Sequence, residues 1–548
     1  MTRGPAVLEK ERSRSRSHRR AVASGVSSNE VTTAVEVNKD VEQASSSSSG
    51  GALPQSLSTR CLTYTLEAQD GRARAATIQL PHGPVQTPVF MPVGTQGTIK
   101  GLLSREVKAL GPQIILGNTY HLANRPNCDR LRKCGGLHNF MQWDRNILTD
   151  SGGFQMVSLL KLASINEQGV EFEDPKNPGS MMLLTPEESI RSQNAIGSDI
   201  MMQLDDVVSS CEPDKKRVEE ATHRTTRWLD RCIAAHANPE RQNLFAIVQG
   251  GLHEDLRKIS LADLKARGDH CPGYAIGGLS GGESKHEFWQ VVAQCTDEEK
   301  DGLPKLKPRY CMGVGYMLDI VVCVALGVDM FDCVYPCRTA RFGTALTRQG
   351  QLRLSSAARF ENDFGVIEEG CDCYTCAQAK YSRSYLSQIV AKNDKSNPVG
   401  ATLLTIHNVR FMMRLMSDMR KAILEGKFSE WVVRFLQTLY PQHTPSDSST
   451  SKTSKKIKMK QAPAAQKGEV VDHEKSNGQN EAPEESKVVD EKKAASSMKP
   501  DDEEKADGPL LPPLWVKDAL MRAKIRGLKE AFDWENGTHS KEDMPKMQ

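Results

Sequence analysis

The stretch Tyr274-Ala-Ile-Gly-Gly-Leu-Ser-Gly-Gly282 contains the pattern that decides the fold of this chain. A short apolar run ends in a glycine-rich cluster, and a longer stretch with helical spacing follows at residues 285–294. Short apolar runs bounded by turn residues are typical of buried strands, and longer periodic stretches are typical of helices. The unit therefore predicts a buried strand, a loop and a helix.

Eight such apolar runs occur over about 250 residues, and each ends in a polar or glycine-rich cluster. The runs are 89–93, 113–117, 147–149, 199–204, 244–248, 274–276, 310–312 and 328–331. Helix-like stretches lie between several of them, at 183–196, 215–235, 285–294 and 318–326. Eight strand–helix units favour a (β/α)8 TIM barrel, which places its active site at the carboxyl ends of the strands. A doubly wound open sheet has the same local pattern but commonly about six strands, and it is the alternative.

The flanking regions differ from this core in composition. The chain has 548 residues and a net charge of +3, and its longest apolar run falls far short of the ~20 residues that span a bilayer. No integral membrane segment is expected.

The interval between Tyr440 and Trp515 has no aromatic residue, so it cannot bury enough apolar surface to offset its ordering entropy. The predicted parts are a disordered leader (1–56), a barrel (57–365), a zinc-binding subdomain with closing helices (366–440), a low-complexity linker (441–513), a helix (514–535) and a tail (536–548).

The leader and the cysteines bear on localisation. The leader is rich in arginine and serine and has no apolar stretch after its basic start, which excludes a secretory signal. Such a leader is typical of a mitochondrial or nuclear address, and equally of a solvated tail. Most of the 14 cysteines stand singly in apolar stretches, which indicates reduced thiols and a cytoplasmic protein.

Four aspartates lie at the predicted carboxyl ends of strands: Asp150, Asp205, Asp206 and Asp332. One such aspartate is often a loop cap, but a buried carboxylate is costly unless it is hydrogen-bonded or used. Because the strand ends of a barrel meet at one mouth, we expect several of these side chains to converge there. Two carboxylates in one cleft suit chemistry at a sugar anomeric carbon, where one captures the oxocarbenium-like centre and the other moves a proton.

Glycine-rich and basic segments adjoin these aspartates. In Asp150-Ser-Gly-Gly-Phe154 the glycines let a planar ligand approach the backbone, and Phe154 is available to stack on it. Residues 277–282 offer bare backbone amides and carbonyls without a GxGxxG or Walker pattern. Arg338 and Arg341 are suited to phosphates or base edges, although a salt-bridged surface loop is the commoner explanation of such a pair.

The sharpest local motif is Cys371-Asp-Cys373-Tyr-Thr-Cys376, with three thiols in six residues. An odd number of thiols in a chain of intracellular composition disfavours disulfides and predicts a zinc site. The first histidine downstream, His407, opens an amphipathic stretch and supplies a fourth ligand. Three thiolates and an imidazole leave no open position, so we expect one structural Zn²⁺ per chain.

Together these motifs resemble those of the tRNA-guanine transglycosylase family. The resemblance covers residues from about 64 to 440, and the tails match nothing in the family. The matching motifs are Thr149-Asp-Ser-Gly-Gly-Phe-Gln155, Val248-Gln-Gly250, Gly277-Gly-Leu279, Met312-Gly-Val-Gly315, Asp329-Met-Phe-Asp-Cys333 and the Cys-x-Cys-x2-Cys set with its later His-Asn-Val-Arg.

The resemblance implies a pentosyltransferase that exchanges guanine at the wobble position of tRNAs with GUN anticodons for queuine. Asp332 would be the nucleophile that forms a covalent enzyme–RNA intermediate, and Asp150 would be the general acid/base. The implied substrate-binding residues are Asp150, Phe154, Asp205, Gln249, Gly278, Leu279 and Met312, with Val207 and Gly281 beyond the seven-position of the base. The implied contacts to the tRNA anticodon loop are Gly313, Gly315, Tyr316, Asp319, Arg338, Thr339 and Arg341. The implied zinc ligands are Cys371, Cys373, Cys376 and His407, in a subdomain that also lies against the RNA.

The chain departs from the bacterial members of the family at three places. Asp206-Val207 replaces their Glu-Cys, and Leu279-Ser-Gly-Gly282 replaces their Leu-Ala-Val-Gly and resembles the eukaryotic members. Glycine in place of valine at position 281 leaves room for the cyclopentenediol of queuine. Cys337 stands where the family usually has threonine, which removes one hydroxyl near the RNA.

The resemblance also implies a heterodimer with a homologous, non-catalytic subunit. This chain could itself be that RNA-binding partner, but it retains both Asp150 and Asp332, which argues for the catalytic subunit. A retaining glycosidase is the alternative from another class. Such an enzyme needs neither a zinc site nor the paired arginines, and its sugar subsites are usually rich in tryptophan, which is absent from these strand ends.

Overall fold

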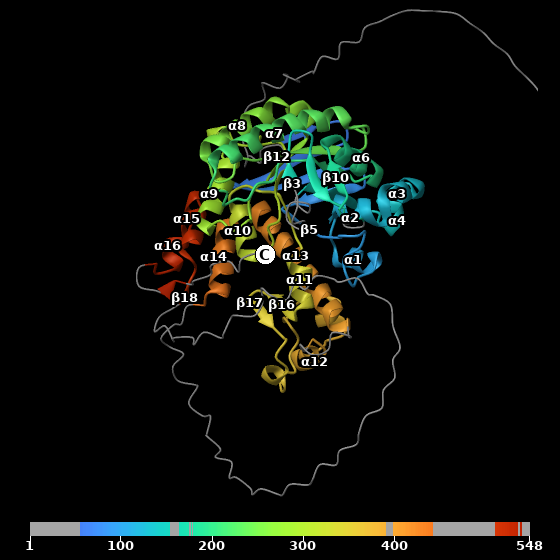
Figure 1. The fold of residues 1–548 in the computed structure, drawn as a ribbon. Helices are drawn as coiled ribbons and strands as arrows, with labels where there is room; N and C mark the ends of the chain where they lie inside the picture. Colours follow the sequence, from blue (N-terminus) through green and yellow to red (C-terminus); the bar gives the residue numbers. More distant parts are fainter. Residues whose placement is uncertain are drawn as a thin grey trace, which may run out of the picture. The chain divides into compact units, whose positions relative to one another are not determined.

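The computed structural model describes residues 55–153, 164–174, 177, 179–390, 398–441, 510–534 and 538–539. The centre of this described part is a barrel of eight parallel strands (Figure 1). The strands are β5 Val89–Pro92, β6 Ile114–Gly117, β7 Asn146–Thr149, β11 Ile200–Met202, β12 Asn243–Val248, β13 Gly273–Ile276, β14 Arg309–Cys311 and β15 Met330–Cys333. They follow the order β5-β15-β14-β13-β12-β11-β7-β6, and a parallel bridge between Val93 and Leu116 joins the two end strands. The predicted barrel is confirmed, and each predicted apolar run overlaps one of its strands.

Helices lie outside the strands, as Figure 1 shows for α6 to α10. The helices between barrel strands are α1 Ser104–Leu110, α2 Thr119–Leu122, α3 Cys128–Cys134, α4 Leu137–Met141, α6 Pro186–Ile196, α7 Lys215–Ala235, α8 Glu254–Ala266, α9 Lys285–Cys295 and α10 Met317–Ala325. The stretch predicted as helical from residue 183 begins as a helix only at Pro186. The Thr185 hydroxyl accepts a hydrogen bond from the amide of Glu188, and proline suits the first helical turn.

Two antiparallel sheets, which we did not predict from the sequence, flank the barrel. One contains β1 Gln55–Ser58, β2 Thr63–Asp70, β3 Ala73–Leu80 and β4 Gly83–Thr87, and the other contains β8 Ser164–Ile165, β9 Val170–Glu173 and β10 Met181–Leu184. The first sheet covers the amino-terminal end of the barrel. There, the buried Arg74 guanidinium pairs with Asp329, the residue before β15, and Tyr64 donates to the same carboxylate. The opposite end, where the strands finish, is not covered by this sheet.

A smaller subdomain follows the last barrel strand. Its elements, together with the helices that close the barrel, are α11 Tyr335–Arg341, β16 Thr344–Thr347, β17 Gly350–Arg353, α12 Arg383–Ile389, α13 Val399–Leu424 and α14 Phe428–Leu439. Helix α13 contacts α11 and β16 in the subdomain, and it also contacts β2, β3 and β5. One long helix thus ties the subdomain to the barrel.

The carboxyl-terminal segment packs on the barrel helices. Residues 514–535, predicted as one helix, form two short helices, α15 Leu514–Arg522 and α16 Leu528–Ala531, and β18 Leu510–Leu511 pairs with β19 Thr538–His539. Lys524 has a positive φ of 62°, which interrupts the helical path between them. Helix α15 contacts α9 and α10, and α16 contacts α14.

Several expectations fall largely outside the described residues. They concern the leader, most of the linker and the last residues of the chain. Within the predicted leader only Gln55 and Ser56 are described, and they begin β1. Within the predicted linker Leu510–Leu511 is described, as β18. Among the described residues no helix is long and apolar enough to cross a membrane.

Candidate functional site

Asp332 lies in β15 at the carboxyl end of the barrel, as predicted. Its Oδ1 atom accepts hydrogen bonds from the Tyr310 hydroxyl at 2.5 Å and from the Gly313 amide at 2.8 Å. Burial raises the pKa of this carboxyl, while the two hydrogen bonds favour the charged form and lower it. The side chain keeps part of its surface open. Asp332 is therefore a positioned carboxylate with one oxygen bound twice and with access for a ligand.

Asp150 follows β7 and is held from the neighbouring β6 loop. Its Oδ2 accepts from the Asn118 side-chain amide at 2.5 Å, and its Oδ1 accepts from the Thr119 backbone amide at 2.8 Å. The Tyr310 hydroxyl binds Asp332, and burial, the largest cause, together with the charges of Asp332 and then Asp150 raises the pKa of this phenol. The two predicted catalytic carboxylates thus face one region of the barrel mouth.

Asp205 and Gln249 form the next part of the site. The Gln249 side-chain amide donates to Asp205 at 2.6 Å, and the Ser151 hydroxyl lies 3.5 Å from the other carboxylate oxygen. Burial raises the pKa of Asp205 to about 6, while the Gln249 hydrogen bond opposes this shift. A Cβ at Gly278, where φ is +64°, would collide with the Gln249 side-chain oxygen. Glycine is therefore required here, and carboxylate, amide and bare backbone lie together as a polar edge that suits a purine-like base.

Asp206 does not belong to this group. Its carboxylate is fully buried and pairs with Arg217 at 2.6 Å and with Arg224 at 2.5 Å, both on α7. Of the four strand-end aspartates, Asp206 is therefore not among those whose side chains converge at the mouth. The α7 arginines hold Asp206 on the outer side of the barrel, whereas Gln249, which follows β12, binds Asp205.

The remaining residues expected around the base are placed as follows. Leu279 and Met312 are half-buried. Leu279 packs against the hydrophobic cluster that contains Ile276, and Met312 packs against the cluster that contains Met330. Val207 is half-buried and Gly281 is exposed. A Cβ at Gly281 would lie 2.6 Å from the Ser210 hydroxyl oxygen, so Ser210 is its immediate neighbour, where we expected open space. The predicted stacking residue, Phe154, lies outside the described residues.

The loop between β14 and α10 lies directly beside Asp332. The Gly313 amide binds Asp332, and a Cβ at Gly315 would collide with the side chain of Cys333, which explains glycine at this close approach. The Tyr316 ring packs against Tyr335 with 4.3 Å between ring centroids. This loop therefore moves little without disturbing the end of β15.

Asp319, expected to contact RNA, is buried. Its carboxylate pairs with Lys285, and the exposed fractions of the two side chains are 5% and 9%. Burial raises the pKa of Asp319, and the charge of Lys285 opposes that shift. The structure thus assigns Asp319 an intramolecular ion pair, which leaves it no open surface for RNA.

Arg338, Thr339 and Arg341 lie on α11. The Thr339 hydroxyl donates to the Tyr335 carbonyl within the helix at 2.8 Å. Both arginines are exposed, and neither pairs with a carboxylate among the described residues. The salt-bridged loop considered above is therefore not what forms, and both arginines, on the helix that follows β15, are exposed to solvent.

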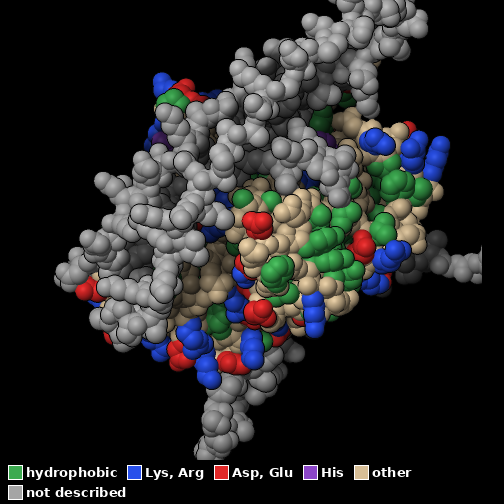
Figure 2. Space-filling model, turned by 90° about the horizontal axis from the view of Figure 1, so that it is seen from below, with side chains coloured by type: hydrophobic (Ala, Val, Ile, Leu, Met, Phe, Trp, Pro, Cys, Tyr) green, Lys and Arg blue, Asp and Glu red, His purple; other side chains and the backbone are tan. Residues whose placement is uncertain are grey.

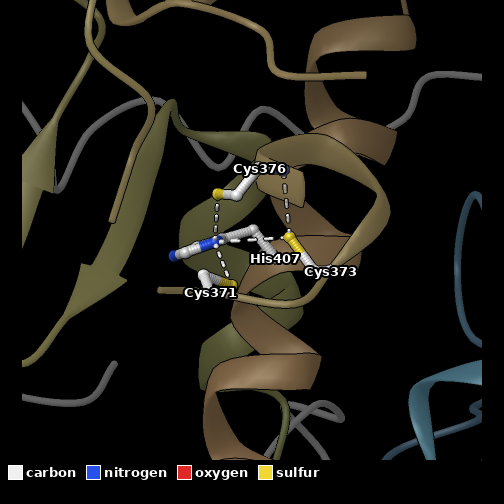
Figure 3. Close-up of side chains that lie close together, drawn as sticks. All are labelled: Cys371, Cys373, Cys376 and His407. Atoms are coloured by element: carbon white, nitrogen blue, oxygen red, sulfur yellow. Dashed lines mark hydrogen bonds between the residues drawn. The ribbon is translucent and has the colours of Figure 1, made fainter. Parts of the chain in front are cut away.

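The predicted metal ligands come together in the subdomain (Figure 3). The His407 Nδ1 atom lies 3.6, 3.7 and 3.3 Å from the Sγ atoms of Cys371, Cys373 and Cys376. A tetrahedral site with metal–sulfur bonds of ~2.3 Å and metal–nitrogen bonds of ~2.0–2.1 Å separates sulfur from nitrogen by about 3.6 Å, which matches these distances. His407 Nε2 lies 2.8 Å from the Leu346 carbonyl, a hydrogen bond that leaves Nδ1 as the ligand atom. The four buried side chains fit a structural metal ion.

Three functional contacts escaped the sequence reasoning. Asn118 and Thr119 lie in a polar cluster directly after a predicted strand. Their position indicates the barrel mouth, but it does not indicate that they bind Asp150. Tyr310 belongs to the apolar run of β14, and no local signal shows that its hydroxyl reaches Asp332 on the neighbouring strand β15.

Comparison with known proteins matches this geometry. A family model described as queuine tRNA-ribosyltransferase matches residues 69–441. A queuine tRNA-ribosyltransferase catalytic subunit of Schizosaccharomyces pombe is 56% identical over 369 residues, which cover 66% of this chain and 88% of that protein. The Caenorhabditis elegans protein of that name is 46% identical over 412 residues (75% and 98%), and a Fusobacterium nucleatum queuine tRNA-ribosyltransferase is 44% identical over 379 residues (69% and 98%). The chain therefore belongs to the queuine tRNA-ribosyltransferase family.

Proposed function

We propose that this chain is a catalytic tRNA-guanine transglycosylase that replaces guanine at the wobble position of tRNAs with GUN anticodons by queuine. The observation that carries this proposal is the pair of positioned carboxylates, Asp332 and Asp150, at the carboxyl ends of barrel strands β15 and β7. Family membership adds support, since the matching relatives are named for this activity. A non-catalytic partner would not need both carboxylates, which favours the catalytic role.

In the first displacement the free oxygen of Asp332 attacks the ribose C1′ atom. The C1′–N9 bond breaks, its electron pair moves to the purine, and Asp150 supplies the proton that guanine takes up on leaving. The Tyr310 hydroxyl and the Gly313 amide hold the other oxygen of Asp332, so the attacking lone pair is oriented before the substrate binds. The product is an ester between Asp332 and the tRNA.

In the second displacement the incoming base takes the place that guanine left. Asp205, Gln249 and the Gly278 backbone would bind the guanine-like face shared by both bases. Asp150 removes the proton from the incoming base, whose nitrogen attacks C1′ and releases the Asp332 carboxylate. Atoms and charges balance, and no redox cofactor is needed.

The metal in the Cys371, Cys373, Cys376 and His407 site is proposed to be zinc. Three thiolates and one imidazole are a donor set that zinc prefers, and no ligand position is left for substrate. The metal would hold the residues before α12 against α13. Its role is therefore structural, and no step of the exchange passes through it.

A second, homologous subunit is proposed as partner. Two of the relatives are named as catalytic subunits. On this chain Phe342 and Phe364 are 72% and 75% exposed, and Tyr374 and Tyr385 are also exposed. Figure 2, seen from the side on which α12 lies in Figure 1, shows hydrophobic side chains grouped among charged ones. Exposed apolar groups of this kind favour a protein interface.

A cytoplasmic localisation is proposed from the composition of the chain, and mitochondrial or nuclear targeting is proposed from its basic leader. Imaging of the full chain and of a form lacking residues 1–54 tests it. An unchanged distribution after this deletion would contradict targeting by the leader.

The function is tested with full-length protein, a GUN-anticodon tRNA and radiolabelled guanine, with and without a candidate partner subunit. We expect label to enter the tRNA and unlabelled queuine to chase it out. Asp332→Ala should abolish both label entry and the denaturation-resistant protein–RNA adduct, while tRNA binding measured by filter retention stays near wild type. An adduct that still forms with Asp332→Ala would show that another residue is the nucleophile.

A further inference from the structure

The helices beyond the family match are part of the packed body. The match ends at residue 441, whereas α15 begins at Leu514. Val516, Ala519 and Leu520 are fully buried in the core that also contains residues of α9 and α10. Arg522 adds an ion pair with Asp297 at 2.7 Å. This segment therefore docks on α9 and on α10, the helix that follows the β14–α10 loop.

The docked segment places an aromatic ring against a buried cation. The Nζ atom of Lys285, in the first turn of α9, lies 5.6 Å from the centroid of the Trp515 ring. The same ammonium pairs with Asp319 in α10 and lies 5.7 Å from the Tyr316 ring. A buried ion pair is stabilising only where its geometry is fixed and where further contacts compensate both charged groups for the loss of water. A ring that covers a cation supplies such a contact through cation–π attraction.

The same ion pair lies one loop away from the proposed nucleophile. Asp319 lies in the first turn of α10, which follows the loop that starts at Gly313. The Gly313 amide donates to Asp332, and Gly315 leaves no space between this loop and Cys333. A contiguous set of contacts thus runs from Trp515 to Asp332. Coupling between distant groups passes through such packed contacts, and mutation is needed to demonstrate it.

We propose that Trp515 is a positioning residue for the exchange reaction. It holds Lys285 on Asp319, and thereby keeps the start of α10 in place and the Gly313 amide on Asp332. The inference rests on the proposed function, because that function assigns Asp332 as the nucleophile. It adds a role for a segment that lies outside the matched region.

The test compares two substitutions that both keep an apolar side chain at this position. Trp515→Phe retains a ring for the cation, and Trp515→Leu does not. Leu514→Ala is the control, because Leu514 is the exposed neighbour on the same helix. Adduct formation is measured in single turnover with full-length protein at saturating tRNA, and thermal unfolding shows whether each variant is folded.

We expect Trp515→Leu to slow adduct formation about 2- to 30-fold, the range that corresponds to the loss of one cation–π contact. Trp515→Phe should keep most of the rate, and Leu514→Ala should keep all of it. Loss of the Gly313 hydrogen bond should also raise the pKa of Asp332, so that the acidic limb of the pH–rate profile moves to higher pH. The Tyr310 hydroxyl also binds this carboxyl, and the adjacent Cys333 thiol interacts with its charge; both are unchanged in the variants.

A folded Trp515→Leu protein with the rate and acidic limb of Leu514→Ala would overturn the inference. Equal losses in Trp515→Leu and Trp515→Phe would also overturn it, because the ring would then have no special part. If Trp515→Leu is unfolded, the rate and pH profile of Trp515→Phe decide: a small loss of rate with the acidic limb shifted to higher pH supports the inference, and wild-type values or a loss with an unshifted limb refute it. Absence of any adduct with the wild-type chain would instead refute the proposed function.

Discussion

The hydrogen bond from Tyr310 to Asp332 makes a quantitative prediction about pH. Tyr310→Phe removes the hydroxyl that lies 2.5 Å from Oδ1 and keeps the ring in the barrel interior. A hydrogen bond to a charged group contributes about 1.5–3 kcal/mol, and one pKa unit corresponds to about 1.4 kcal/mol. Removal should therefore raise the pKa of Asp332 by about 1–2 units, above a value that burial has already raised. The Gly313 amide remains to hold the carboxylate.

The sign of the effect follows from which form reacts. Only the carboxylate attacks C1′, so the rate of adduct formation falls as the pH drops through the pKa of Asp332. Raising that pKa moves the acidic limb to higher pH by the same about 1–2 units, and it leaves the alkaline limb, which depends on the proton held by Asp150, in its wild-type position. A second transition belongs to Asp205, whose pKa is about 6, and Asp205→Asn identifies it.

The assay is single-turnover adduct formation from pH 5 to 9 at saturating tRNA, resolved on denaturing gels. Tyr274→Phe is the matched control, because Tyr274 is a buried tyrosine on the neighbouring strand β13 with no hydrogen bond to Asp332. Its profile should coincide with that of the wild type. An unshifted acidic limb in Tyr310→Phe would show that the hydroxyl does not stabilise the reacting carboxylate. A uniform fall of the rate at every pH would show that it acts by positioning alone.

Three further predictions concern the metal, the base and the barrel. Metal analysis should give about one zinc per chain, and Cys373→Ala should lose it and destabilise its subdomain, because structural zinc binding is itself folding energy; full zinc retention after loss of two site cysteines contradicts the site. Gly281→Val should lower kcat/KM for queuine about 5- to 150-fold and for guanine much less, because the valine and the displaced Ser210 take space that only the larger base needs. Equal losses for the two bases would show that Gly281 does not line the pocket. Asp206→Ala should lower the free energy of unfolding by about 2–4 kcal/mol, less than for a fully buried pair because Arg217 is one-third exposed. Denaturant titration measures this free energy of unfolding. Unchanged stability with a raised KM for the base would show that Asp206 contacts the substrate at the barrel mouth.

Much of the site was determined by the sequence alone, since it depends on local features. Strand ends of a parallel barrel meet at one mouth whatever the details of packing, so a polar residue directly after a buried run is placed there. This rule was sufficient to bring Asp150 and Asp332 to the same region. The three thiols of residues 371–376 are close together in sequence, and the first histidine after them completes a donor set that is typical of a tetrahedral metal site.

Only the tertiary structure decided which way the side chains point and which distant groups they meet. Asp205 and Asp206 are adjacent and both follow β11, and nothing local in the sequence shows which of them reaches the mouth. The answer depends on α7, whose arginines take Asp206, and on Gln249, which takes Asp205.

The same reason explains the contacts that escaped prediction. The Tyr310 hydroxyl reaches Asp332 from the neighbouring strand, and Trp515 reaches Lys285 from a segment 230 positions further along the chain. Such pairings are set by how whole elements pack, and packing depends on shape and burial summed over many residues. A sequence pattern therefore determines that a strand ends in a carboxylate, and the assembled fold determines what holds that carboxylate in place.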